Sequence, residues 1–208
     1  MRPRGPDPFL PTSVLHGVVT AILVMILRVD TMMVSFSGTV LVDYPILLCP
    51  FCLSAGDFVK FGFPMAAMTT QLAWGAISFE DGYTNAGQLE YIKKTIQWAT
   101  DYFIDANRLP DEFIGQIGDG DDDHNYWGRP EDMDMDRPVM TISPSNPGSD
   151  LAGETAAALA AASIFYNNIG ETALADEALE NARELYEFAT QYEGKYSDSI
   201  SDAANFYK

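Results

Sequence analysis

Asp57 is the first residue along the chain whose type and surroundings suit catalysis. It follows Ala55 and Gly56, which form a flexible turn, and it precedes Phe58 and Val59, which can anchor in a hydrophobic core. A carboxylate on such a mount can act as a general base and take a proton from water. An aspartate after a glycine is also common as a turn residue or helix cap. The residues around Asp57 must therefore decide between these roles.

His124 and Trp127 form a second candidate group, in a segment rich in glycine and aspartate. An imidazole can exchange hydrogen bonds with sugar hydroxyls, and the face of an indole can cover the apolar face of a glucose ring. Taken by themselves, the same residues are also typical of a hydrogen-bonded loop histidine and a buried core tryptophan.

Four acids near His124 raise the question of a cation site, because oxygen-rich loops suit Ca²⁺. Their spacing lacks the distal bidentate glutamate of an EF-hand, so we interpret them as a solvated acidic loop and expect no metal and no cofactor; they are Asp119, Asp121, Asp122 and Asp123. Further along, charges of alternating sign predict salt bridges that brace this loop, from Arg129, Glu131, Asp132 and Arg137.

The order of these motifs resembles that of the glycoside hydrolase family nine endoglucanases. Residues 55–65 are similar to the entrance of that family's active site. Further similar blocks follow in the family's order, at residues 116–120, 123–132, 137–138, 149–158, 196–198 and 204–207. The resemblance spans residues 55–208, which correspond to well under half of a complete family domain.

The resemblance implies inverting hydrolysis of internal β-1,4 links in cellulose and related glucans. It implies that Asp57 is the general base that activates water and that His124 and Trp127 contact sugar in the cleft. The family's helper carboxylate falls at Ser54, whose hydroxyl can hold the water but cannot share its charge. The reaction also needs a carboxylic acid to protonate the leaving oxygen. In the family this is a glutamate near the end of the domain, beyond the matched blocks, so we expect the chain alone to be nearly inactive.

Apolar periodicity predicts an all-α fold. A first helix begins near Pro64 and has an apolar stripe at Met65, Met68, Leu72, Ala76 and Phe79. A second has a strict stripe at Leu89, Ile92, Ile96, Ala99 and Phe103, with Lys93, Lys94 and Gln97 on the other side. The resemblance implies that these helices are the first hairpins of an incomplete (α/α)6 toroid, in which six inner helices are surrounded by six outer ones.

Two further helices and a long loop complete this prediction. The third helix runs from Ser149 and Asp150, whose side chains could cap it, to about Asn167, and its alanines suggest burial among other helices. The fourth runs from Thr172 to about Tyr192, with a fifth starting near Asp198. Residues 108–148 lack a sustained period, which predicts a long irregular loop with a short strand at residues 113–117.

Charge is distributed unevenly along the chain, whose net charge is −18. Residues 1–56 hold three of the 30 acids and three of the 12 bases, so residues 57–208 hold 27 acids and nine bases. Such a field repels nucleic acid and anionic membranes but is compatible with a neutral polysaccharide. We therefore expect a β-1,4-glucan as partner, with neither nucleic acid nor a membrane.

Residues 1–54 differ in character from the rest and are expected to form a separate, atypical apolar segment. The apolar run from Val14 to Leu27, after Arg2 and Arg4, is signal-like, and the resemblance implies a secreted protein. A membrane anchor or mistranslated non-coding sequence remain alternatives. Cys49 and Cys52 have the spacing of a redox or zinc motif but lack a second ligand pair, so we interpret them as incidental.

Two other functions compete with catalysis. The chain could be a non-catalytic carbohydrate-binding fragment, which Trp127 and His124 would permit. It could also be a helical interaction module, although no fixed-period repeat links its helices.

Overall fold

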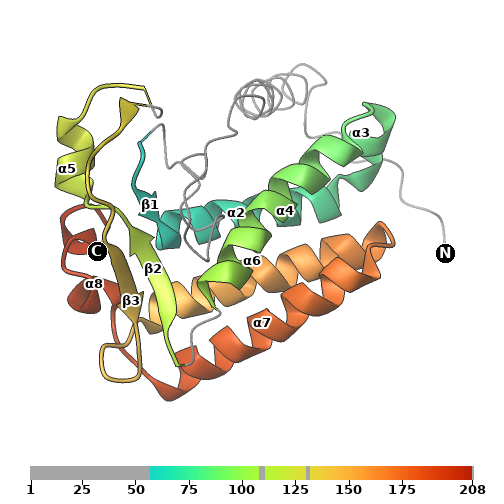
Figure 1. Ribbon diagram of the computed structural model, residues 1–208. Helices are drawn as coiled ribbons and strands as arrows, with labels where there is room; N and C mark the ends of the chain where they lie inside the picture. The colour runs from blue at the N-terminus through green and yellow to red at the C-terminus, as the bar shows by residue number, and fades with distance from the viewer. Residues whose placement is uncertain (1–56, 108–110, 130–131, 208) are drawn as a thin grey trace, which may run out of the picture. The chain divides into compact units, whose positions relative to one another are not determined.

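The computed structural model describes residues 57–107, 111–129 and 132–207 of the chain (Figure 1). The elements in order are β1 (Lys60–Phe61), α2 (Gly62–Ser78), α3 (Glu80–Asn85), α4 (Leu89–Ala106), β2 (Phe113–Ile117), α5 (Gly120–Asn125), β3 (Val139–Ile142), α6 (Ser149–Asn168), α7 (Thr172–Gln191), α8 (Tyr196–Ser199) and the 3₁₀ turn η2 (Ala203–Asn205). Ser54, the cysteine pair and the signal-like run lie outside the described residues.

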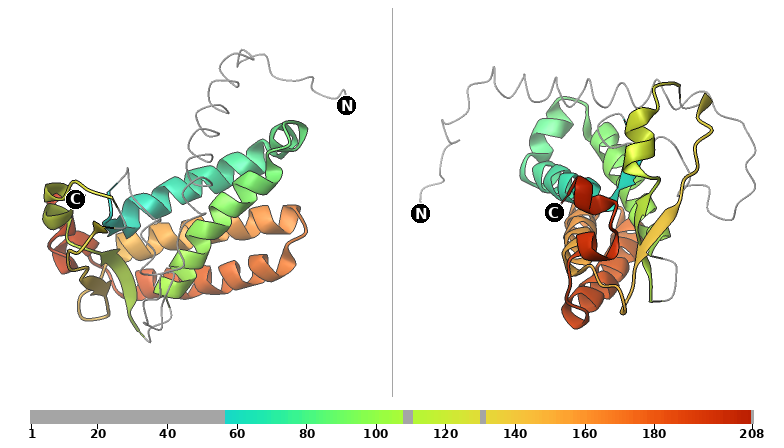
Figure 2. Two further views of the ribbon diagram at one scale, coloured as in Figure 1. Left: turned by 45° about the horizontal axis from the view of Figure 1, so that its top comes forward. Right: turned by 90° about the vertical axis from the view of Figure 1, so that its left-hand side faces the viewer.

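Four long helices form the body of this part of the chain. Helix α6 packs against both α2 and α7, and α4 contacts all three of them (Figures 1 and 2). Half of α6 is buried, including Leu151, Leu159 and Phe165, as its small apolar composition predicts. The all-α class is confirmed. Among the described helices, none combines the length and apolar character that crossing a membrane requires.

The amphipathic helices α4 and α7 follow their predicted patterns closely. In α4, Ile92, Ile96 and Phe103 are fully buried while Lys94 is exposed. In α7, the predicted face is buried through Ala175, Ala178, Ala182 and Leu185. Both helices have one apolar stripe facing α6 and a polar face toward solvent, which is what a regular 3.6-residue period dictates.

The predicted apolar stripe of α2 is only partly correct: Ala76 is buried, and Met65 and Leu72 pack against the core. Met68 and Phe79 are each more than half exposed, and the buried face consists of small residues, namely Gly62, Ala66, Thr69, Ala73 and Ala76. Small side chains let α2 and α6 approach each other closely. At Gly62, for example, an added Cβ would lie only 3.2 Å from the side chain of Leu151 in α6. Met68 and Phe79 were predicted to be buried because they are large and apolar, but close helix packing favours residues of small volume.

The segment expected to be a long irregular loop contains regular structure. Strands β1, β2 and β3 form an antiparallel sheet in that order, with Phe61 opposite Gln116 and Phe113 opposite Ile142. The strand predicted at residues 113–117 is confirmed as β2, which is buried along its whole length. The sheet lies at the end of the helices where α2 and α6 begin (Figure 1).

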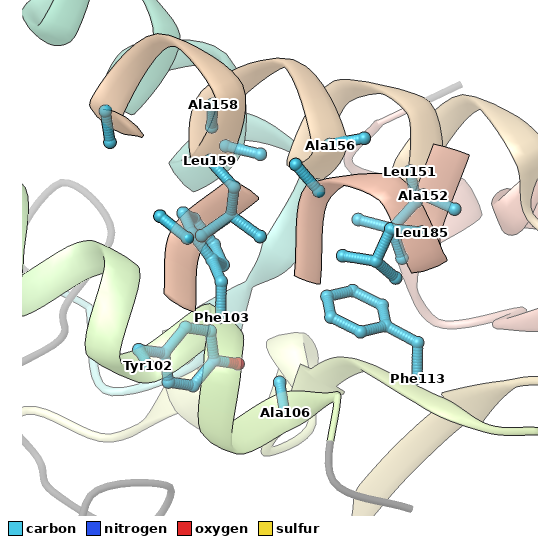
Figure 3. Packing of buried hydrophobic residues seen from close by; sticks show 14 of the residues in the cluster. Tyr102, Phe103, Ala106, Phe113, Leu151, Ala152, Ala156, Ala158, Leu159 and Leu185 are labelled. Carbon is cyan, nitrogen blue, oxygen red and sulfur yellow. The ribbon is translucent and has the colours of Figure 1, made fainter. Parts of the chain in front are cut away.

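The core joins this sheet to the helices. Figure 3 shows Phe103 from α4 and Phe113 from β2 pointing toward the side chains of α6 and Leu185 of α7. Phe103, Phe113 and Leu185 are at most 2% exposed. Burial of aromatic and aliphatic side chains of this size stabilises the fold by about 1.5–3 kcal/mol each. The central strand β2 is therefore anchored to the helices through the core.

The N-cap residue of α6 is Gly148, and of the two predicted capping side chains only Asp150 accepts a hydrogen bond from an N–H group of the first turn. Ser149 donates its hydroxyl to the carbonyl of Gly194, and Asp150 accepts hydrogen bonds from the backbone N–H groups of Leu151 and Tyr196. These side chains therefore connect α6 to the segment after α7, beyond which the predicted fifth helix is the short α8 followed by η2.

Candidate functional site

Asp57 lies immediately before the sheet, on a backbone segment whose other residues are buried. Phe58 and Val59 are in the core, whereas the Asp57 side chain is 36% exposed. The Phe58 ring also packs edge-on against Tyr126 at a centroid distance of 5.6 Å. The carboxylate is thus accessible to solvent while its backbone is anchored.

Asp123, which the sequence analysis placed in a solvated acidic loop, is buried at 4% exposure. Its Oδ1 accepts hydrogen bonds from the backbone N–H groups of Phe58 at 2.8 Å and Val59 at 3.1 Å. Burial raises the pKa of Asp123 above its ordinary value, and the charge of Asp57 adds to this effect. The two backbone hydrogen bonds and the neighbouring His124 lower it in part.

His124 faces the Asp57 side chain. Its Nε2 lies 3.5 Å from Oδ2 of Asp57, and its side chain is 43% exposed. The ring packs edge-on against Phe206 with centroids 5.0 Å apart. Consecutive residues on a helix point about 100° apart, so α5 directs Asp123 toward the backbone after Asp57 and His124 toward its carboxylate.

Helix α5 is held at its first turn by two acids. Asp119 is the N-cap, because its Oδ1 accepts hydrogen bonds from the N–H groups of Asp121 and Asp122, both at 3.0 Å. Asp202 accepts hydrogen bonds from the N–H of Gly120 and from Nε2 of Gln116. The position of His124 therefore depends on side chains from β2 and from the segment around η2.

Arg137 also braces the segment after Asp57. Its guanidinium donates a hydrogen bond to the carbonyl of Phe58 at 2.6 Å. The alternating charges around this residue predict that it braces the loop through salt bridges. The hydrogen bond to Phe58 shows that Arg137 braces the backbone of the candidate site.

Trp127 lies two residues beyond α5 and its side chain is fully exposed. An indole in this position is not a core residue, and its faces are free to contact a ligand. The structure brings Asp57 and His124 into contact, whereas Trp127 shares no described side-chain contact with either. Its role in binding sugar stays a prediction.

The three polar side chains at the centre of the site could serve a water molecule or a cation. Asp57, Asp123 and His124 each offer one ligand-type atom, and these atoms lie within 4.8 Å of one another. Carboxylates with an imidazole can bind a divalent ion, but they can equally hold and polarise a water molecule. Oδ1 of Asp123 already accepts two backbone hydrogen bonds, which leaves the Asp57 carboxylate and the His124 ring as the more exposed groups of this cluster.

Comparison with known proteins identifies the family. The model of "Glycosyl hydrolase family 9" matches residues 54–208. This match covers well over half of the chain, and the chain therefore belongs to glycosyl hydrolase family 9, as its motifs predicted.

Similar proteins carry endoglucanase names. The chain is 46% identical over 153 residues to Endoglucanase 2 of Oryza sativa subsp. japonica and 48% identical over 154 residues to Endoglucanase B of Cellulomonas fimi. Each match covers 74% of this chain, but only 24% and 15% of the respective relatives. The chain thus spans a quarter or less of the length of these curated relatives.

Solved structures of the family agree with the fold. An endoglucanase from the termite Nasutitermes takasagoensis is 61% identical with a TM-score of 0.70, and the match covers 73% of this chain and 35% of that one. The cellulase Cel9M of C. cellulolyticum is 33% identical with a TM-score of 0.67, over 74% of this chain and 35% of that one. The helical hairpins described above therefore correspond to the first part of the (α/α)6 barrel of this family.

Sequence reasoning missed Asp123 as a residue of the site. Its position at the end of an acidic run made it look solvated like Asp121 and Asp122, which are exposed, although the similar block of residues 123–132 begins with Asp123. The signal was its neighbour: if His124 faces Asp57 from a helix, the residue before it must point elsewhere, and here it points to the backbone of Phe58 and Val59.

Proposed function

We propose that residues 57–207 supply the general-base half of the active site of an inverting endo-β-1,4-glucanase. The substrate would be cellulose or a related neutral glucan, which suits the strong negative charge of this part of the chain. Asp57 would take a proton from the water that attacks the anomeric carbon. His124 would bind sugar hydroxyls beside it.

One observation carries this proposal. The Asp57 carboxylate is partly exposed and 3.5 Å from His124, on a backbone fixed by buried Phe58 and Val59. A general base needs both features, since it must reach water and still keep its direction during the reaction. The membership of glycosyl hydrolase family 9 and the endoglucanase names of the relatives support the choice of reaction.

The proposed reaction also needs a second carboxyl group, which acts as the acid. Inverting glycosidases use a second carboxyl group about 6.5–9.5 Å from the base to protonate the leaving oxygen. Asp123 cannot fill this role in the geometry observed, because it is buried and lies within 4.8 Å of Asp57 in the cluster with His124. We place the acid in a part of the family domain outside the matched region and expect the 208-residue chain alone to release little sugar.

Trp127 would provide an aromatic platform for a neighbouring glucose unit. Its full exposure and its place three residues after His124 support this role. We also propose a secreted protein, in keeping with a polymeric substrate outside the cell.

The test restores a complete domain. Residues 54–208 would replace the matching segment of the termite endoglucanase, with which they share 61% identity, and sugar release from a soluble β-1,4-glucan would be measured. We expect Asp57→Asn to lower kcat by about 10²- to 10⁴-fold, while the matched Asp121→Asn variant, which alters an exposed acid of α5, retains activity. Ser54→Asp should raise activity by restoring a helper carboxylate. Full activity of the Asp57→Asn protein would show that the base lies elsewhere.

A further inference from the structure

We propose that Asp123 is a positioning residue for this reaction, whose buried carboxylate fixes the backbone directly after Asp57 and thereby the direction of the Asp57 side chain. The inference rests on the proposed role of Asp57 as the base. It goes beyond that role because it assigns a function to an acid that does not itself face the substrate.

The hydrogen bonds of Asp123 fall where the sheet gives no support. Strand β1 is only two residues long and its pairing with β2 begins at Lys60. Phe58 and Val59 precede this pairing, and their N–H groups both donate to one oxygen of Asp123. A single side chain from α5 therefore does for this segment what a ladder of strand hydrogen bonds does for the residues that follow.

The peptide groups next to Asp57 are held from two directions. Asp123 accepts from the N–H of Phe58, and Arg137 donates to the carbonyl of the same residue. With both backbone groups of Phe58 bound, the orientation of the preceding residue is restricted to a narrow range. Its carboxylate then meets His124, which is the next residue after Asp123.

A carboxylate is a costly way to satisfy two N–H groups in a buried place. Burial and the charge of Asp57 both raise the pKa of Asp123, which means that folding disfavours its ionised form. An asparagine would present a similar oxygen without this cost. Charged acceptors, however, make shorter and stronger hydrogen bonds than neutral ones. A residue that gives up stability in exchange for a firmly held backbone is the pattern expected of a functional position.

Two variants separate the carboxylate's charge from its shape. Asp123→Asn keeps the size and one acceptor oxygen but removes the charge, whereas Asp123→Ala removes the acceptor altogether. Asp122→Asn is the matched control, because it removes the same charge one residue earlier from an exposed side chain.

Hydrogen exchange in the 208-residue chain measures positioning without requiring activity. In Asp123→Ala, we expect the amide protons of Phe58 and Val59 to exchange at least about tenfold faster than in the unmodified chain, because their acceptor is lost. Asp122→Asn should leave both rates unchanged. Unchanged exchange at both amides in Asp123→Ala would overturn the proposal. Should the alanine variant fail to fold, Asp123→Asn is expected to show a smaller increase at both amides, because a neutral acceptor oxygen replaces a charged one, and unchanged rates in that variant would overturn the proposal instead.

Stability against pH distinguishes positioning from a purely structural role. Because the folded pKa of Asp123 is raised, the contribution of Asp123 to stability falls as the pH rises from 3.8 through that folded value, and Asp123→Asn lacks this loss. The melting temperature of Asp123→Asn relative to the unmodified chain should therefore increase toward neutral pH. A relative melting temperature that falls over this range would mean that the charge serves the fold.

Kinetics in the termite chimaera complete the test. We expect Asp123→Ala to lower kcat by about 10- to 100-fold, as misplacement of a catalytic group does, with KM changed by less than about twofold and Asp123→Asn in between. If Asp57→Asn is inactive and Asp123→Ala is fully active, this inference fails while the proposed function stands. If Asp57→Asn is itself active, the proposed function fails.

Discussion

The carboxylate of Asp202 accepts a hydrogen bond from the backbone N–H of Gly120, 3.0 Å away. This contact joins the C-terminal segment around η2 to the first residue of α5, which carries both Asp123 and His124. The same carboxylate accepts a hydrogen bond from the side-chain amide of Gln116. Gln116 lies in β2, opposite Phe61 of β1. Asp202 thus lies in a second layer of contacts behind the candidate site.

Replacing Asp202 with alanine should loosen α5. The N–H of Gly120 and the amide of Gln116 would lose a charged acceptor, and hydrogen bonds of this kind contribute about 1.5–3 kcal/mol. Because Asp202 is partly exposed, we expect a loss of about 2 kcal/mol in the free energy of unfolding, measured by denaturant titration. Asp198→Ala, in an exposed position of α8, is the control. Equal stability of the two variants would show that this contact does not hold α5.

Two glycines of α2 should respond oppositely to alanine. A Cβ at Gly62 would lie 2.7 Å from the backbone oxygen of Gly115 in β2, whereas a Cβ at Gly75 would have no atom within 4 Å. We expect Gly62→Ala to destabilise the chain by about 1–3 kcal/mol, since backbone must move. Gly75→Ala should stabilise it by about 0.5–1 kcal/mol through helix propensity. Thermal melts of both variants test the packing of α2 on the sheet, which a stable Gly62→Ala protein would contradict.

The residues that sequence predicted well are those with a regular period. Helices α4 and α7 pack one face on α6, so Ile92, Ile96 and Leu185 stand out at helical spacing. Helical spacing of large apolar residues did not predict the buried face of α2, because its contact with α6 favours small residues and leaves Met68 exposed. Periodicity detects hydrophobic faces but not how closely two helices approach.

The candidate site was only partly predictable for a related reason. Asp57 and His124 stood within motifs, but their 3.5 Å contact joins residues 67 positions apart. Asp123 stood at the start of a similar block, but its partners could not be predicted, because they are backbone N–H groups, which every residue except proline carries. Nothing in a sequence marks which N–H groups a sheet will leave unpaired. The N–H groups of Phe58 and Val59 precede the pairing of β1 with β2, and only the folded structure shows that Asp123 binds them.

Removing residues 1–54 should leave the helical domain folded, as we propose that this segment is not part of the catalytic domain. The family match begins at residue 54. The core described here is built from α2, α4, α6, α7 and the sheet. We expect residues 55–208 to retain the helical circular dichroism of the 208-residue chain and to be more soluble. Loss of the helical signal would mean that residues 1–54 are needed for folding.

Tyr166 should make the fold sensitive to alkali. Its hydroxyl contacts the Thr100 hydroxyl at 2.9 Å between α6 and α4, and burial raises its pKa to about 12 from an ordinary value of 10.0. Since the folded state favours the neutral phenol, its contribution is fully present below pH 10 and is lost as the pH rises toward 12.

The size of this effect follows from the raised pKa, because one pKa unit corresponds to about 1.4 kcal/mol. Between pH 9 and pH 11, the free energy of unfolding should fall by about 1 kcal/mol more in the unmodified chain than in Tyr166→Phe, measured by guanidinium titration at each pH. The control is Tyr186→Phe, which removes the hydroxyl of an exposed tyrosine in α7 and should leave the alkaline slope unchanged. Equal slopes for the unmodified chain and Tyr166→Phe would mean that this phenol ionises without opening the contact between α4 and α6.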